Sequence, residues 1–259
     1  MAELLTRRAG AILILTLARP HVRNALTRTL RRSLATALTE AEADASVRAV
    51  VLTGEGNAFC AGLDLAELEE SLSYPSERHR ADSRALADLF LQMVRFPKPL
   101  IAAVNGHAVA GGAGLVTACD VAVMAEDAKI GYTEARIGFV AALVSVLLVR
   151  QVREKHARDL LLSARLIPAE EAARMGLVNK VCHREEVLPL ALTRAEQMVA
   201  NAPSSHRLTK ELLASVGTMP LDDAMRWAVA VNALARTGDE LSEGVRAFLS
   251  KRDPEWTTK

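Results

Sequence analysis

Short apolar runs recur along the first half of the chain. They lie at residues 11–17, 48–53, 100–104 and 120–125. Runs of this length that are bounded by turn residues predict β-strands, and the first run (AILILTL) predicts a buried one.

A helical spacing separates the first two runs. Leu30, Leu34 and Leu38 with Ala41 repeat at i, i+4, i+8 and i+11. This stripe predicts an amphipathic helix over residues 27–44, and Thr27 is a suitable N-cap. A second helix is predicted over residues 76–96, because the proline that follows disfavours continuation of a helix.

Glycine-rich turns follow the predicted strands. Residues 54–62 form a loop with three glycines, residues 105–107 form a turn, and residues 111–114 (GGAG) open a short helix. Because strands and helices alternate, we expect an α/β fold whose parallel strands are joined by crossovers.

The strand signals stop near residue 185. Four helices are predicted beyond it, over residues 185–200, 203–215, 220–234 and 239–251. We therefore expect an α/β core over residues 1–195 and a helical region over residues 196–259. Such a region serves either for oligomerisation or packs back on its own core, and the pattern leaves both alternatives open.

Composition narrows the class of protein. Half of the 259 residues are hydrophobic, the net charge is +1 and aromatic residues make up 3%. A nucleic-acid partner is not expected, because basic and stacking surfaces are scarce. The three cysteines lack metal-ligand spacing, so we expect no metal site and a reduced cytoplasmic setting. Residues 139–149 are about half as long as a membrane span, and no signal peptide or membrane partner is expected.

Two loops have the composition of anion-binding turns. Residues 57–65 and 105–114 each follow a strand, lead towards a helix and are rich in small residues. Small residues let a ligand approach the backbone, and a helix N-terminus offers free N–H groups to negative charge. Taken singly, each loop is equally well interpreted as an ordinary tight turn.

Together these motifs resemble the crotonase (enoyl-CoA hydratase/isomerase) superfamily, especially its bacterial enoyl-CoA hydratases. The resemblance rests on residues 17–20 (LARP), 23–26 (RNAL), 59–65 (FCAGLDL), 99–106 (PLIAAVNG), 110–112 (AGG), 119–120 (CD) and 243–252 (EGVRAFLSKR). It covers nearly the whole chain. It implies a spiral of repeated ββα turns with a C-terminal helical trimerisation region, assembled as trimers or as hexamers.

The resemblance also implies roles for particular residues. The backbone N–H groups of Leu63 and Gly111 form an oxyanion hole for the thioester oxygen of an acyl-coenzyme A, whose coenzyme A is part of the substrate rather than a cofactor. Contacts to coenzyme A are implied for Arg23, Ala25, Ala61, Leu63, Asp64, Leu65, Phe248 and Lys251. The last two are expected to reach a coenzyme A bound by a neighbouring subunit. Without the resemblance, Phe248 is interpreted as a core residue and Arg23 as a surface charge.

The acid–base residues depart from the family pattern. The best-known hydratases have a glutamate three residues after the oxyanion glycine and another twenty residues further on. Here these positions are Gly114 and Glu134. Glu134 alone is therefore expected to move protons, unless it merely caps a helix. Three functions follow: a hydratase acting on 2-enoyl-CoA, a Δ3,Δ2-enoyl-CoA isomerase, or a non-catalytic acyl-CoA binder.

Other residues near the motifs are interpreted as structural. Asp64 and Asp120 match structural positions of the family, Glu67 is expected on a solvated helix face rather than in the pocket, and His107 is expected to pack. The apolar residues 139–146 form either a wall of the acyl pocket or part of the core.

Overall fold

The computed structural model describes residues 2–257. Met1 and residues 258–259, at the outer ends of the two predicted regions, lie outside the described residues. The larger sheet has the strand order β1-β2-β3-β5-β7-β10, and only β1 runs antiparallel to its neighbour. Its strands are β1 (Leu4–Ala9), β2 (Ile12–Leu17), β3 (Ala49–Gly54), β5 (Leu100–Val104), β7 (Val121–Ala125) and β10 (Lys180–Cys182). The predicted strands all lie here, and β1 and β10 were not predicted.

A smaller sheet carries the glycine-rich turns. Its order is β4-β6-β8-β9, and its strands are β4 (Ala58–Cys60), β6 (His107–Val109), β8 (Lys129–Gly131) and β9 (Ile167–Pro168). The first three strands run parallel, whereas β9 is antiparallel to β8. Strand β4 lies inside the predicted loop 54–62, because a three-residue strand is too short to show a hydrophobic period.

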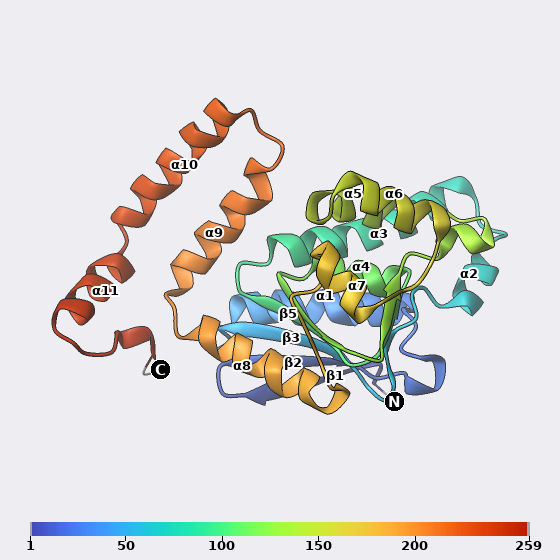
Figure 1. Cartoon of the computed structure of the whole chain (residues 1–259), viewed down its shortest axis with the longest axis horizontal. Helices are drawn as coiled ribbons and strands as arrows, with labels where there is room; N and C mark the ends of the chain where they lie inside the picture. Colours follow the sequence, from blue (N-terminus) through green and yellow to red (C-terminus); the bar gives the residue numbers. More distant parts are fainter. Residues whose placement is uncertain (1, 258–259) are drawn as a thin grey trace.

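Helices cover both faces of the larger sheet. Helix α8 (Val187–Val199) packs on β3, β5 and β7, and Figure 1 shows it on the side of the sheet opposite to α3, α4 and α5. The other helices of the core are α1 (Arg28–Ala43), α2 (Leu65–Ser71), α3 (Ser76–Arg95), α4 (Gly111–Ala118), α5 (Ala142–Gln151), α6 (Glu154–Ser163) and α7 (Ala169–Met175). Strands β3 and β5 are therefore buried along their whole length, as expected for a parallel sheet covered on both faces.

Short 3₁₀ helices lie at the connections. They are η1 (Pro20–Val22), η2 (Glu134–Ile137), η3 (Arg184–Glu186) and η4 (Glu255–Thr257). The predicted cap of α1 is present, since Thr27 Oγ1 accepts a hydrogen bond of 2.9 Å from Leu30 N. Within the described chain, no helix has the length and apolar composition that crossing a membrane requires.

Three C-terminal helices extend away from the core. They are α9 (Pro203–Val216), α10 (Leu221–Arg236) and α11 (Asp239–Leu249), and Figure 1 shows α9 and α10 side by side with α11 beyond them. Helix α8 spans residue 195 and belongs to the core by its packing, so the chain leaves the core only after α8. Arg48 stabilises the segment that follows α8. Its guanidinium donates to the carbonyls of Val199, Asn201 and Trp256 at 2.8–3.1 Å.

Candidate active site

Three parallel neighbouring strands bring the predicted catalytic positions to one edge of the smaller sheet. Leu63 follows β4, Gly111 follows β6 and Glu134 follows β8, each within three residues of the strand end. Because the carboxyl ends of parallel strands meet at the same edge, residues far apart in the sequence lie together there.

The two predicted oxyanion donors are close to each other. A Cβ atom added to Gly62 would lie 3.3 Å from the nitrogen of Gly111, and a Cβ atom added to Gly111 would lie 3.7 Å from the nitrogen of Leu63. Neither nitrogen donates to a protein acceptor within residues 2–257. The pair therefore presents two free N–H groups to a single small region.

Unusual backbone angles precede both donors. Gly62 has φ +94°, and Ala110 has φ 51° and ψ −121°. The left-handed region is open to glycine but strained for alanine. A hydrogen bond of 2.8 Å from Ala110 N to Gly131 O holds this strained residue against the end of β8. The conformation turns the peptide of Gly111 towards the site.

Helix α4 begins at Gly111 and is buried along its whole length. Gly112 lies so close to the Cys60 carbonyl that a Cβ atom would overlap it. This contact brings the N-terminus of α4 against β4. The N–H groups of a first helical turn have no partner within the helix, so this end favours negative charge.

Glu134 is half-buried at the start of η2. Among the described residues its Oε2 atom is buried without a hydrogen-bond partner. Burial raises the pKa of Glu134, and this outweighs the hydrogen bond from its own backbone N–H, which lowers it. Thr133 is the N-cap residue of η2, and Glu134 follows it in the first turn of this helix. A buried carboxylate oxygen without a partner is suited to accept a proton from a bound molecule.

Gly114 lies one turn along α4 from Gly111, and its neighbours are apolar. A Cβ atom there would lie 2.8 Å from Phe90 Cζ and still closer to a methyl group of Val144. Both neighbours are buried, Phe90 on α3 and Val144 on α5. The space of a side chain at position 114 is therefore already filled.

The segments implied to contact coenzyme A lie beside each other. Ala61 N donates to Arg23 O at 2.9 Å, and residues 26 and 63 form a parallel bridge. Arg23 has a left-handed backbone and an exposed side chain, and Leu65 is exposed. Ala25 is buried.

Asp64 has structural partners in this region. Its carboxylate accepts from Ala66 N at the start of α2 and pairs with Arg19 at 2.8 Å. The hydrogen bond from Arg19 lowers the pKa of Asp64. The side chain of Asp64 is therefore engaged within the protein.

Phe248 and Lys251 are not brought to this site within one chain. Phe248 lies at the end of α11 and Lys251 just beyond it, and Figure 1 shows this helix far from α2 and α4. The interpretation of Phe248 as a core residue is wrong, since 83% of it is exposed. A contact from these residues to coenzyme A would have to come from a second copy.

The other candidate residues have structural partners. Glu67 accepts from Arg28 N at 2.9 Å, at the start of α1. His107 Nδ1 accepts from Lys129 N at 3.0 Å. Asp120 accepts from Leu100 N at 2.8 Å and pairs with Lys210 at 2.5 Å. Among residues 139–146, Val144 lies in the core, whereas Phe139, Val140 and Val146 are exposed.

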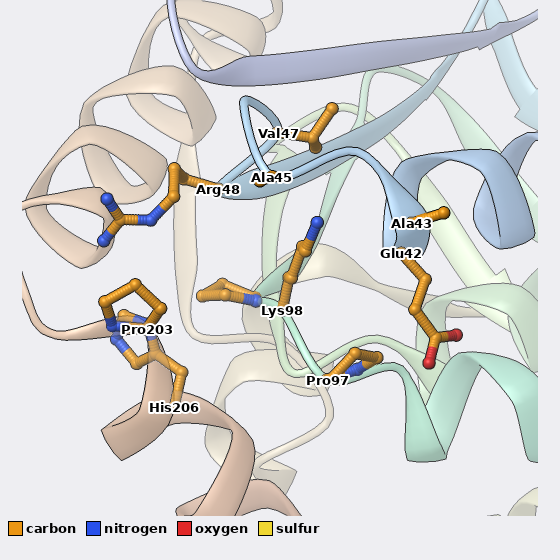
Figure 2. Close-up of a pocket in the computed structure, with 10 residues that line it drawn as sticks. Glu42, Ala43, Ala45, Val47, Arg48, Pro97, Lys98, Pro203 and His206 are labelled. Atoms are coloured by element: carbon orange, nitrogen blue, oxygen red, sulfur yellow. The ribbon is translucent and has the colours of Figure 1, made fainter. Parts of the chain in front are cut away.

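A cavity of about 260 Å³ lies elsewhere, beside the first residues of β3 and β5. Figure 2 shows that its charged side chains point in different directions. Lys98 donates to the carbonyls of Ala41 and Asp44, and Arg48 donates to the carbonyl of Val199 at the end of α8. These cations cap backbone carbonyls, and they do not converge on a common ligand position.

Possible metal-ligating side chains do not cluster in the part of the chain that the structure describes. It contains no group of three or more His, Cys, Asp or Glu side chains placed to hold an ion. The three cysteines are buried and free, and burial raises the pKa of the Cys60 thiol to about 12.

Comparisons with known proteins find similar sequences over nearly the whole chain. The family model described as enoyl-CoA hydratase/isomerase matches residues 7–259. A putative enoyl-CoA hydratase of Thermus thermophilus is 51% identical over 245 residues, which are 95% of this chain and 97% of that protein. A 2,3-dehydroadipyl-CoA hydratase of Escherichia coli is 34% identical over 99% of both chains.

Solved structures show the same fold. A crystal structure of an enoyl-CoA hydratase from Mycobacterium smegmatis superposes with a TM-score of 0.92 at 33% identity, over 99% of this chain and 100% of that one. A Bacillus anthracis enoyl-CoA hydratase gives 0.92 at 29% identity over 100% of both. These matches confirm the predicted crotonase-like fold with its C-terminal helices.

Proposed function

This chain belongs to the enoyl-CoA hydratase/isomerase family, and we propose that it adds water across the 2,3 double bond of a 2-enoyl-CoA thioester. The observation that carries the proposal is the buried, unpartnered Oε2 atom of Glu134 at the sheet edge that also holds the Leu63 and Gly111 N–H groups. The names of the Thermus and Escherichia coli relatives support hydration.

The two N–H groups supply the electrostatic part of the mechanism. Addition of hydroxide to C3 moves negative charge onto the thioester oxygen and gives an enolate. Fixed donors stabilise this charge without reorganising, and loss of one such donor costs about 3–4 kcal/mol. Because Leu63 and Gly111 donate from the backbone, this role does not depend on the side chain of Leu63.

Glu134 supplies the proton transfers. Its carboxylate takes a proton from water as the water oxygen bonds to C3. The resulting carboxylic acid then gives that proton to C2, so one water provides both the hydroxyl group and the hydrogen. The atoms nearest to a Cβ atom at Gly114 belong to Phe90 and Val144. Glu134 is therefore proposed to work without a second carboxylate at position 114.

We assign the coenzyme A contacts to the paired segments around Arg23–Ala25 and residues 61–65. Phe248 and Lys251 are proposed to act from a neighbouring subunit of a homotrimer or a hexamer. Exposed apolar side chains support such an assembly, and they include Leu221, Met225, Val229, Leu234, Leu241, Val245 and Leu249. Coenzyme A enters as part of the substrate, and no separate cofactor is proposed.

The decisive assay follows crotonyl-CoA by the absorbance of its conjugated thioester. We expect turnover by the wild type and its loss in Glu134→Gln. Glu126→Gln is the control, since Glu126 is an exposed carboxylate paired with His183. Full activity of Glu134→Gln would disprove the assignment of the base.

The lone carboxylate also suits a second reaction, the transfer of a proton between C4 and C2 of a 3-enoyl-CoA. Conversion of 3-enoyl-CoA without hydration of any 2-enoyl-CoA would establish the isomerase instead. Tight binding of acyl-CoA without either reaction would establish a non-catalytic binder.

A further inference from the structure

A buried hydrogen bond joins the segment that carries Glu134 to the helix that begins at Gly111. The Tyr132 hydroxyl lies 2.6 Å from Thr117 Oγ1, and both residues are buried. Thr117 Oγ1 also donates to Ala113 O at 2.7 Å. Because a hydroxyl group has a single proton, Tyr132 must donate to Thr117.

This bond lies between the two halves of the proposed site. Thr117 is on α4, whose first residue is Gly111, and Tyr132 lies two residues before Glu134. On the other side of Glu134, residues 135–140 are exposed, and the contacts there are local backbone hydrogen bonds such as that from Phe139 N to Glu134 O at 3.1 Å. Tyr132 is therefore the last buried residue before Glu134.

A second contact stabilises the same helix. Gln151 Nε2, at the end of α5, donates to Thr117 O at 2.5 Å. The bond from Ala110 N to Gly131 O joins the strand ends, but it lies before Tyr132. The side-chain bond thus extends the connection between α4 and β8 towards Glu134.

A phenylalanine at position 132 would fill the same volume without burying a hydroxyl group. A buried hydroxyl costs free energy unless it is bonded, so its presence here has to be balanced by its bond to Thr117. This makes the hydroxyl, rather than the ring alone, the element that orients the segment.

We propose that the Tyr132–Thr117 hydrogen bond is a positioning element that sets Glu134 relative to the Gly111 N–H group. The proposal rests on the proposed function of Glu134 as the base. Neither residue touches the reacting atoms. Their effect is to hold the carboxylate at its working distance from the oxyanion hole.

The test compares Tyr132→Phe, Thr117→Val and the double variant. We expect each single variant to lose about 10- to 100-fold in kcat, the range that a displacement of up to about 1 Å produces. The KM should stay within about twofold, because the coenzyme A contacts are untouched. The double variant should lose no more than a single variant, since all three remove the same bond.

Two further variants separate positioning from stability. Thr117→Ser keeps the hydroxyl group and should restore kcat. Thr53→Val removes another buried threonine hydroxyl, which donates to Ala103 O at 2.9 Å, and should lower the melting temperature without lowering kcat. A kcat within about twofold of the wild type in Tyr132→Phe, or multiplicative losses in the double variant, would overturn the proposal.

The outcome is distinguishable from a failure of the proposed function. If Glu134→Gln abolishes turnover while Tyr132→Phe keeps it, the base assignment stands and the positioning role is wrong. If Glu134→Gln keeps turnover, both are wrong. If the wild type converts only 3-enoyl-CoA, the same variants are compared with that substrate, because both reactions need the carboxylate beside the oxyanion hole.

Discussion

Val144, on α5, occupies the space into which a side chain at Gly114, on α4, would have to extend. Its methyl group would overlap a Cβ atom at position 114, and Phe90 closes the same space from α3. The site is therefore not a two-carboxylate site with one side chain removed. Its neighbouring helices are packed for a glycine.

Restoring a carboxylate at position 114 should consequently fail. Gly114→Glu is expected to destabilise the fold by about 1–3 kcal/mol or more, because overpacking forces neighbours to move. Urea unfolding measures this, and hydratase activity should not rise. Gly217→Glu is a matched control, since a Cβ atom at Gly217 meets no atom within 4 Å. A Gly114→Glu protein as stable as the wild type would contradict the packing argument.

The strained backbone of Ala110 gives a second prediction. Ala110→Gly removes a strain of about 1–3 kcal/mol, which outweighs the larger unfolded-state entropy of glycine. The free energy of unfolding should therefore rise or stay unchanged. Ala108→Gly, at the buried position of strand β6, should lower it instead. Equal losses in the two variants would show that Ala110 is unstrained.

The raised pKa of Glu134 predicts the pH dependence of activity. If Glu134 is the base, it works when ionised, so kcat/KM should fall as the pH drops through a pKa higher than that of an ordinary glutamate. A profile whose acid limb lies at or below the ordinary glutamate value would contradict the burial of this carboxylate.

The same group predicts a pH dependence of stability. A carboxyl group whose pKa is raised by folding stabilises the native state at low pH, and this contribution is lost as the pH rises through the folded pKa. Glu134→Gln should therefore be more stable than the wild type at neutral pH, with a smaller difference near pH 4. Urea unfolding at the two pH values measures this, and a wild type that is the more stable at neutral pH would contradict it.

The exposed position of Phe248 predicts an effect on substrate binding alone. If Phe248 contacts coenzyme A bound by a neighbouring subunit, Phe248→Ser should raise KM for the thioester severalfold and leave kcat and the melting temperature nearly unchanged. Leu162→Ser is the control, since 79% of Leu162 is exposed on α6. A KM that is unchanged in Phe248→Ser would exclude this contact.

Local patterns were sufficient to locate the main strands, the capped helix α1, and the loops that carry Leu63 and Gly111. Apolar runs indicate buried strands, and Thr27 caps a helix that is formed by the residues directly after it. These features therefore depend on residues that are only a few positions apart. Strand β1 was not predicted, because four of its six residues are exposed and its sequence lacks a continuous apolar run. Strands β4 and β6 are too short to show a period.

The other features of the site and of the C-terminal helices depend on packing between segments that are distant in the sequence. The filling of the Gly114 space by Phe90 and Val144, the bond from Tyr132 to Thr117, and the exposure of Phe248 have no signal in sequence spacing. Each depends on how helices and strands from separate parts of the chain are placed in space. The turns that carry the proposed backbone donors are thus predictable from sequence, whereas the packing around Gly114 and the burial that raises the pKa of Glu134 are properties of the folded chain.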